Sequence, residues 1–322
     1  MADLKRIVVG LDGSTLAEAA LPYAEVFARA HQAALVLVRA VSPVHDPADI
    51  PERRTHTPAD DEVGDPPEMD FPRTRHLVYE AEHYLATIAR QLRERGALVD
   101  VVVVIGEPAR ILVEEARGHD AEMIILSTHG RAGFGRWIYG SVADQVMREA
   151  RMPVLLVPPA CRLPWPRDHT PRILIPLDGS PRAEEVLGPA CALAVPLCAQ
   201  VVLTRIVEPI AVAEPSMGRV SLGNALDREI RAVSDVERGH AYVATVAAKL
   251  HADGLRVQIA EGIGPASMTI AEIARDEGAD LVALTPHGCQ GDNGPALGDT
   301  AFGIIRLADM PILVVHHPTP GG

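Results

Sequence analysis

Residues 7–14 read IVVGLDGS and residues 173–180 read ILIPLDGS, and this repeated pattern is the strongest indication of the fold. Each stretch is a short apolar strand that leads into an Asp-Gly turn and then into a serine suited to cap a helix. The same start therefore occurs twice in a chain of 322 residues, a length for which two domains are expected. We predict that each copy begins its own domain.

The residues after each start alternate between helical and strand-like patterns. Apolar side chains fall on one helical face in residues 20–28 and again in residues 186–194. Uninterrupted apolar runs at 34–38 and 201–204 are typical of strands buried on both faces, as in a parallel sheet. Further strands are expected at 99–105, 123–126 and 153–157 in the first copy and at 255–260, 281–284 and 311–315 in the second. This alternation implies right-handed crossovers, so each copy is predicted to be a five-stranded open parallel α/β domain.

The two copies differ in the segment that follows the second strand. Residues 43–75 are rich in proline and contain an acidic cluster at 60–62, so we predict a flexible insertion there. The second copy has a different insertion at about 208–235. Prolines between 158 and 171 indicate a stiff linker. We therefore predict domains at residues 1–158 and 171–317, joined by a linker at 159–170.

Composition limits the classes of partner. The chain is 48% hydrophobic, which supports real cores, and its net charge of -13 argues against general binding to nucleic acid or acidic membranes. A local basic loop could still hold a small anion. The chain shows no signal peptide and no apolar run long enough to cross a bilayer, and its four cysteines form no CxxC pair. We expect a cytoplasmic protein with reduced thiols and no metal site.

The copies differ most in the loop after the fourth expected strand. Residues 130–141 read GRAGFGRWIYGS, which is glycine-rich and basic, whereas residues 288–299 read GCQGDNGPALGD, which has no Lys or Arg. Glycines let a backbone approach an anion closely, and a helix N-terminus offers free amides to phosphate. We predict that Ser141 caps such a helix. The alternative is an ordinary turn followed by a capped helix.

The expected fold brings this loop close to the first turn. Ligands of open parallel sheets bind beyond the carboxyl ends of the strands, where the strand order reverses. Asp12, Gly13 and Ser14 follow the first strand, and His129 and Gly130 follow the fourth. We expect these residues to meet at one cleft.

With these motifs, the chain resembles the universal stress protein family in its tandem two-domain form. Gly130, Gly140 and Ser141 match the family's G-2x-G-9x-G-(S/T) nucleotide motif, while Ser127 replaces its first glycine. The resemblance covers nearly the whole chain except the insertions and the linker. It implies two tandem open parallel-sheet α/β domains, Rossmann-like and adenine nucleotide alpha hydrolase-like. They would form a pseudo-dimer by pairing residues 154–157 with 312–315, and a homodimer of the whole chain would be compatible with this.

The resemblance also implies that the N-terminal domain binds ATP, with or without Mg²⁺. Asp12 and the Leu11 backbone would lie near the adenosine, beside a small apolar position at Ala40 or Val41. His129 and Gly130 would contact phosphate or ribose, and Gly140, Ser141 and Val142 would hold the phosphates; the alternative for His129 is a structural role in the loop. We add the cations Arg131 and Arg136, with the alternative that both face solvent. The full predicted set is Leu11, Asp12, Gly13, Ser14, Ala40, Val41, Ser127, His129, Gly130, Arg131, Gly133, Arg136, Gly140, Ser141 and Val142.

The second copy departs from the motif at the position of Ser141, where it has Asp299. A carboxylate at about 4 Å from phosphate oxygens is repelled by ~1 to 4 kcal/mol, and each ~1.4 kcal/mol changes affinity about tenfold. We therefore predict that this domain binds ATP weakly or not at all. The alternative is a Mg²⁺ ion that bridges Asp299 and phosphate.

The sequence shows no machinery for rapid hydrolysis. A GxxxxGK[ST] loop is missing, and no convincing base is present to orient water, so no residue is assigned a catalytic role. The leading interpretation is a stress-response protein that uses ATP as ligand or regulator. The alternatives are a ligand-free interaction or scaffold module and a slow nucleotide hydrolase.

Overall fold

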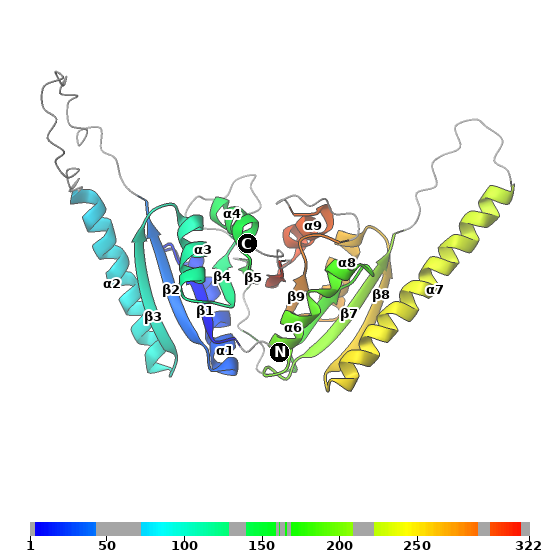
Figure 1. Ribbon diagram of the computed structural model, residues 1–322, viewed down its shortest axis with the longest axis horizontal. Helices are drawn as coiled ribbons and strands as arrows, with labels where there is room; N and C mark the ends of the chain where they lie inside the picture. The colour runs from blue at the N-terminus through cyan, green and yellow to red at the C-terminus, as the bar shows by residue number, and fades with distance from the viewer. Residues whose placement is uncertain are drawn as a thin grey trace, which may run out of the picture.

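The computed structural model describes residues 4–42, 72–128, 140–158, 161, 165, 169–208, 222–288 and 297–316, with only the backbone described for 222–235. These residues form one ten-stranded sheet with the strand order β3-β2-β1-β4-β5-β10-β9-β6-β7-β8 (Figure 1). Strands β1 to β5 belong to the N-terminal half of the chain and β6 to β10 to the C-terminal half. The predicted pair of five-stranded α/β domains is therefore confirmed.

Each half follows the same order of strands and helices. The N-terminal half contains β1 (Arg6–Gly10), the 3-10 helix η1 (Ala17–Ala20), α1 (Leu21–His31), β2 (Ala34–Val41), α2 (Pro72–Glu94), β3 (Leu98–Ile105), α3 (Pro108–Gly118), β4 (Met123–Ser127), α4 (Ser141–Glu149) and β5 (Val154–Val157). The C-terminal half contains β6 (Arg172–Pro176), α5 (Pro181–Glu184), α6 (Leu187–Ala194), β7 (Gln200–Val207), α7 (Leu222–Ala252), β8 (Arg256–Ile263), α8 (Ala266–Asp276), β9 (Leu281–Leu284), α9 (Asp299–Leu307) and β10 (Ile312–Val314).

The strand order of each half reverses beside its first strand. β1 pairs in parallel with β2 on one side, where Gly10 lies opposite Val38, and with β4 on the other, where Val9 lies opposite Ile125. β6 lies in the same way between β7 and β9. The chain therefore leaves β1 in one direction and returns to its other side, which creates a switch point at the carboxyl ends of β1 and β4.

Helices cover both faces of the sheet and enclose two apolar cores. One core includes residues from α1, α2, α6 and α7, and the other includes residues from α3, α4, α8 and α9. Successive residues of the central strands alternate between these cores, so Val9 belongs to the first and Val8 to the second, both at 0% exposure. Burial on both faces explains why these strands are uninterrupted apolar runs.

The two halves join through their last strands. β5 and β10 pair antiparallel, with Leu155 opposite Leu313 and Val154 opposite Val314, and all four residues are fully buried. This pairing confirms the predicted pseudo-dimer. It also leaves neither strand with a free edge, which an apolar strand would otherwise expose to other chains.

Two described residues of the linker region are tied to α1. Trp165 is 6% exposed and meets Phe27 edge to face, with ring centroids 5.3 Å apart. The Tyr23 hydroxyl and the Cys161 thiol lie 2.8 Å apart, at hydrogen-bonding distance. Because buried aromatic pairs contribute packing energy of roughly 0.5–1.5 kcal/mol beyond area burial, this contact anchors the connection on the N-terminal domain.

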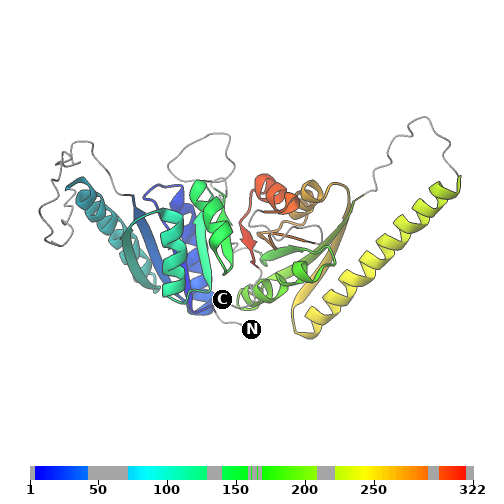
Figure 2. The same cartoon turned by 45° about the horizontal axis from the view of Figure 1, so that its top comes forward.

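The two predicted insertions end earlier than expected, because long helices replace their last residues. Residues 72–75, assigned to the flexible insertion at 43–75, form the first turn of α2. Residues 222–235, assigned to the second insertion, form the start of α7, which projects beyond the sheet (Figure 2). Pro72 did not exclude a helix because proline is tolerated at the first helical position. Residues 43–71 and 209–221 lie outside the described residues.

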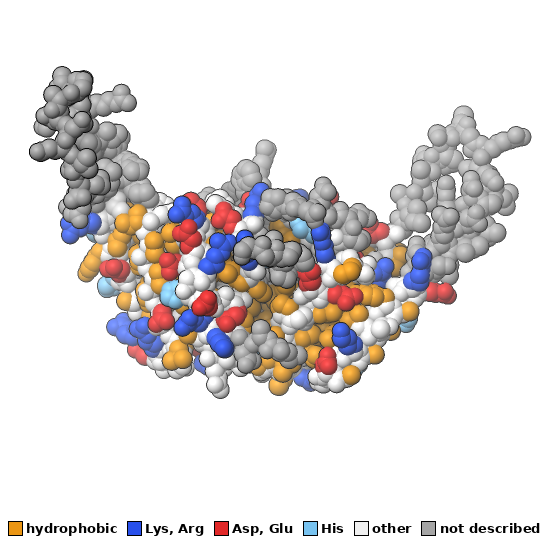
Figure 3. All heavy atoms as spheres, viewed as in Figure 1, with side chains coloured by type: hydrophobic (Ala, Val, Ile, Leu, Met, Phe, Trp, Pro, Cys, Tyr) orange, Lys and Arg blue, Asp and Glu red, His pale blue; other side chains and the backbone are white. Residues whose placement is uncertain are grey.

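The helices and the visible surface carry polar as well as apolar side chains. Among the described residues, no helix is both long and apolar enough to cross a bilayer. On the face shown in Figure 3, acidic and basic side chains are interspersed rather than gathered by sign.

Candidate functional site

The turn after β1 is held by its own hydrogen bonds. The Leu11 amide donates to the Val38 carbonyl at 3.0 Å, which continues the β1–β2 pairing past the end of the strand. Asp12 Oδ1 then accepts from the Ser14 amide at 2.8 Å, and Ser14 Oγ accepts from the Ala17 amide at 3.1 Å. Gly13 has φ +83°, a backbone that favours glycine. Ser14 accepts from the first residue of η1, although Leu16 is the N-cap of that helix. The predicted capping serine is confirmed in the second copy, where Ser180 is the N-cap of α5 and its hydroxyl accepts from the Ala183 amide.

The long loop after β4 is closed at its base. Ser127 ends β4, and the Thr128 amide donates to Val157 of β5 at 3.1 Å. The Gly140 amide then donates to the Thr128 carbonyl at 2.6 Å, so both ends of the loop are joined. This hydrogen bond sets where α4 begins.

The predicted cap of α4 is wrong by one residue. Gly140 is the N-cap, with an extended backbone (φ -61°, ψ 145°), and Ser141 is the first helical residue with an exposed side chain. The Thr128 contact fixes the backbone of Gly140, so the helix begins after it. Among the described residues no side chain caps α4, and the first amides of a helix are donors that suit an anion.

The remaining predicted residues divide into two groups. Val41 is buried at the end of β2, where its carbonyl accepts from Gly106 at 3.0 Å, and Ala40 and Val142 are half-buried. The structure thus brings Leu11–Ser14, Ala40–Val41, Ser127 and Gly140–Val142 to the carboxyl ends of β1, β2 and β4. The other predicted residues lie outside the described part of the chain: His129, Gly130, Arg131, Gly133 and Arg136.

The second copy shows the same turn and the same loop closure. Asp178 Oδ1 accepts from the Ser180 amide at 2.8 Å, and the Gly298 amide donates to the Pro286 carbonyl at 2.9 Å. Gly298 is the N-cap of α9, and Asp299 is the first helical residue, as Ser141 is in α4.

In this second copy the turn and the loop meet directly. A Cβ atom added to Gly288 would lie 2.1 Å from Asp178 Oδ2, so the carboxylate rests against the glycine backbone. In the C-terminal domain the turn after the first strand and the loop after the fourth are therefore in contact, whereas the corresponding loop residues His129 and Gly130 lie outside the described residues. A side chain at position 288 would require the Asp178 carboxylate to move.

Sequence reasoning missed a polar cluster beside the first turn. The Arg39 guanidinium lies over the Tyr84 ring, 5.3 Å from its centroid, and the Tyr84 hydroxyl donates to Glu18 Oε1 at 3.0 Å. Burial, followed by this hydrogen bond, raises the pKa of the Tyr84 hydroxyl, which stays a donor. The second copy repeats the cluster with Arg205, Tyr242 and Glu184. The recurrence of all three residues in both copies was a signal that the sequence contained.

The described residues contain no group of three or more His, Cys, Asp or Glu side chains that could hold a metal ion. Two buried thiol or hydroxyl groups of the cores, Cys191 and Tyr23, have a raised pKa because burial disfavours their charged forms. Neither lies at the carboxyl end of the sheet.

The architecture defines a tandem α/β protein in which the strand order reverses beside the first strand of each half. The model of the universal stress protein family matches residues 3–158 and, a second time, residues 169–316. The chain therefore belongs to the universal stress protein family.

Individual relatives agree with this assignment. A universal stress protein of Mycolicibacterium smegmatis is 24% identical over 96% of both chains. One from Mycobacterium tuberculosis is 31% identical over 47% of this chain and 44% of its own length, so the match spans less than half of that relative. A solved universal stress protein of Archaeoglobus fulgidus superposes with a TM-score of 0.66 at 15% identity, covering 97% of this chain and 98% of its own, which shows the shared fold.

Proposed function

We propose that the N-terminal domain, residues 1–158, binds ATP as a ligand or regulator with little or no hydrolysis. The C-terminal domain, residues 171–317, keeps the fold but not the nucleotide site. The protein acts in the stress response, and the two domains divide structural and ligand-binding roles. The observation that carries this proposal is the N-terminus of α4 at the switch point of the sheet, which no described side chain caps.

The phosphate end of the proposed site is supported by the start of α4. Gly140 is anchored to Thr128 at 2.6 Å, and among the described residues no side chain caps the helix. A helix N-terminus carries a partial positive charge and free donors, which suit phosphate oxygens. Gly140, Ser141 and Val142 would hold the phosphates there, with Ser127 at the end of the neighbouring strand. The loop between β4 and α4 contributes five further residues, which are assigned to the site from the sequence alone: His129, Gly130, Arg131, Gly133 and Arg136.

The adenosine end is supported by the ends of β1 and β2. Ala40 is half-buried near the end of β2, the strand next to β1, and its side chain is a single methyl group. Asp12 Oδ1 accepts from one amide of its own turn, and a carboxylate has further lone pairs that can accept from hydroxyl donors. These groups fit a nucleoside, and the assigned residues at this end are Leu11, Asp12, Gly13, Ser14, Ala40 and Val41.

The C-terminal domain differs at both ends of the corresponding site. Asp299, at the first position of α9, puts a carboxylate where α4 has Ser141. Ile206 stands in the register position of Ala40, so the second copy has a larger side chain at the end of its second strand. Both differences disfavour a nucleotide, and they support one ATP per chain.

Isothermal titration calorimetry of nucleotide-stripped protein tests the proposal. We expect ATP to bind at sub-millimolar concentration with a stoichiometry near one per chain. Absence of binding would contradict the proposed function and leave the ligand-free scaffold as the better interpretation. Two ATP per chain would contradict the silent C-terminal domain.

Phosphate release separates a regulator from a hydrolase. With saturating ATP and Mg²⁺, we expect turnover to be slow compared with typical enzymes, whose turnover numbers are on the order of 1–10³ per second. Turnover of about 1–10³ per second in the wild type would contradict this expectation. If Gly140→Ala then lost both this turnover and ATP binding, the N-terminal domain would be an ATPase.

A further inference from the structure

The Arg39 side chain lies flat against the turn that the proposed ATP site uses. A Cβ added to Gly13 would lie 2.9, 3.0 and 3.1 Å from Nη1, Cζ and Nη2 of Arg39. Nearly equal distances to these three atoms mean that the Gly13 backbone faces the plane of the guanidinium. The same guanidinium lies over the Tyr84 ring. Arg39 therefore connects α2 to the Asp12–Ser14 turn.

The charges around Arg39 favour this position. The Tyr84 hydroxyl donates a hydrogen bond to Glu18. The negative charges of Glu18 and Asp12 raise the pKa of Tyr84, and the positive charge of Arg39 lowers it. One cation thus lies among two carboxylates. Within the described residues, the contacts of Arg39 are the flat packing on Gly13 and the cation–π contact with Tyr84.

The corresponding arginine of the C-terminal domain packs differently. Arg205 meets Gly179 mainly through Nη1, at 2.9 Å from an added Cβ, while its Cζ is 3.9 Å away. It also lies against α7, where a Cβ added to Gly239 would be 2.5 Å from its Nε. Gly239 stands three residues before Tyr242, and the same position before Tyr84 is the fully buried Ala81.

This difference explains the two orientations. The space that Arg205 occupies beside Gly239 is taken in the N-terminal domain by the methyl group of Ala81. Arg39 cannot withdraw toward α2, and it stays flat on Gly13. The domain with the proposed ATP site is therefore the one in which the arginine supports the turn face-on.

We propose that Arg39 is a positioning residue of the ATP site. By packing on Gly13 it holds the Asp12–Ser14 turn, and with it the Asp12 carboxylate and the Leu11 backbone, in the orientation that meets adenosine. The role rests on the proposed function, but it concerns residues that the family motif does not include. Arg39 acts through the turn and touches no reacting atom.

The experiment compares Arg39→Ala with the matched variant Arg205→Ala in the full chain. Both substitutions remove an arginine from a tyrosine ring, so both should lower the melting temperature by similar amounts. Calorimetric titration with ATP should show about tenfold weaker binding for Arg39→Ala, which corresponds to ~1.4 kcal/mol, and an unchanged dissociation constant for Arg205→Ala.

A ligand-free measurement distinguishes this role from the proposed function. Amide hydrogen exchange of Ser14 and Ala17, which are bonded within the turn, should be faster in Arg39→Ala and unchanged in Arg205→Ala. If the wild-type chain does not bind ATP, the proposed function fails, and this measurement still decides whether Arg39 holds the turn. Unchanged exchange in Arg39→Ala would overturn the positioning role.

Arg39→Lys provides a second variant in case Arg39→Ala does not fold. Lysine keeps the charge but has no planar group to lie on Gly13. We expect its ATP affinity to fall in the same direction as in Arg39→Ala. Full wild-type affinity with lysine, or equal loss of affinity in Arg205→Ala, would overturn the proposal.

Discussion

The residue that distinguishes the two domains most directly is the first of helices α4 and α9. Ser141 and Asp299 occupy the same position, each after a glycine N-cap that is hydrogen-bonded to the far end of its loop. The backbone is therefore the same in both domains, and the side chain alone changes the charge at the helix N-terminus. This makes the pair a controlled comparison for nucleotide binding.

We predict that Ser141→Asp weakens ATP binding about 10- to 100-fold. The added carboxylate would repel phosphate by roughly 1–3 kcal/mol at the partial screening of this exposed position. The melting temperature should not fall, because an acidic residue in the first turn is favourable to the helix dipole. Calorimetric titration and thermal unfolding measure the two effects.

Asp299→Ser is the matched control for this substitution. It should leave the affinity and the stoichiometry of ATP binding unchanged, because the second copy still has Ile206 at the position of Ala40 and a loop at 288–299 without Lys or Arg. Wild-type affinity in Ser141→Asp would contradict the assignment of the phosphates to α4.

Residues of the candidate site were predictable where the motif is local. Asp12, Gly13 and Ser14 form one turn, and their roles follow from adjacency in the chain. Arg39 and Tyr84 lie on different elements separated by the insertion, so only their spatial meeting reveals the contact. The glycine caps were missed for a related reason, because the Thr128 carbonyl that fixes Gly140 belongs to the opposite end of a long loop.

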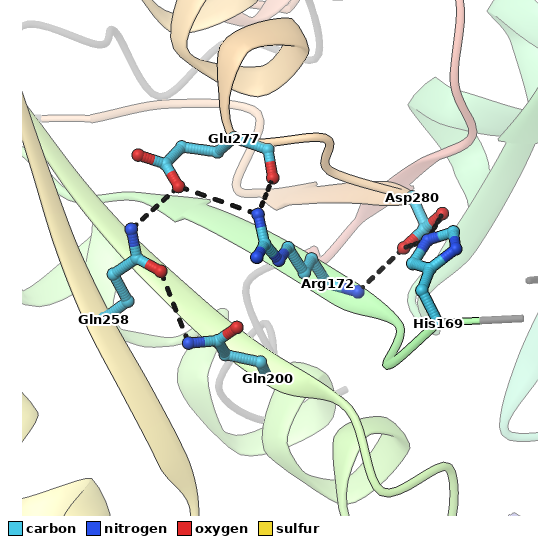
Figure 4. A network of polar contacts seen from close by, with 6 residues as sticks. All are labelled: His169, Arg172, Gln200, Gln258, Glu277 and Asp280. Carbon is cyan, nitrogen blue, oxygen red and sulfur yellow. Dashed lines mark hydrogen bonds and ion pairs between the residues drawn. The ribbon is translucent and has the colours of Figure 1, made fainter.

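At the scale of elements, the amino-terminal end of β6 is fixed by a polar network (Figure 4). Asp280 Oδ2 accepts from the Arg172 amide at 2.8 Å, and its Oδ1 lies 3.2 Å from His169 Nε2. The Arg172 guanidinium donates to the Glu277 carbonyl, and the Glu277 carboxylate accepts from Gln258 Nε2 at 2.7 Å. The network ties the first residue of β6 to the end of α8 and to β8.

We predict that Asp280→Ala lowers the free energy of unfolding by about 1–3 kcal/mol. The substitution leaves the part-buried Arg172 amide without its acceptor, and an unsatisfied donor of this kind costs roughly that amount. ATP affinity should not change, because the network lies at the end of the sheet opposite the cleft. Urea denaturation measures the first effect, and calorimetric titration the second.

Glu122→Ala is the corresponding change in the N-terminal domain. Glu122 Oε2 accepts from the Lys5 and Arg6 amides at 3.0 and 2.8 Å, so its loss should destabilise β1 by a smaller amount in this more exposed setting. If Glu122→Ala lowered the free energy of unfolding more than Asp280→Ala does, the stabilising role assigned to the polar network of β6 would be contradicted.

At the scale of the whole molecule, His316 links the two domains. It follows β10, and its Nε2 and Nδ1 lie 2.8 and 3.2 Å from the carbonyls of Met147 and Met152 in the N-terminal domain. Met147 lies in the last turn of α4, where carbonyls have no partner within the helix. The C-terminal domain thus holds the far end of the helix whose start is assigned to phosphate.

The pH dependence of stability should reveal this contact. Burial lowers the pKa of His316 below its ordinary 6.5; the two carbonyl contacts oppose this shift and His287 adds to it. Below about pH 6.5 the unfolded chain therefore binds a proton that the folded chain resists. Stability is full above that pH and falls as the pH decreases, by at most ~1.4 kcal/mol per pH unit for this group.

Urea denaturation of the wild type and of His316→Gln across this range measures the effect. As the pH falls, the unfolding free energy of the wild type should decrease more than that of His316→Gln, since glutamine does not titrate. Parallel pH profiles would show that His316 does not contribute, because every other histidine is common to both proteins.

The repeated strand, turn and helix signals of the sequence determined the two five-stranded domains, whereas their pairing through β5 and β10 was implied by the family resemblance. These signals are local, and apolar periodicity is sufficient to place them. The tertiary structure alone decided that Gly140 rather than Ser141 caps α4, that Ala81 keeps Arg39 on Gly13, and that His316 reaches across to α4. Each of these depends on atoms from distant parts of the chain, whose contacts no local pattern encodes.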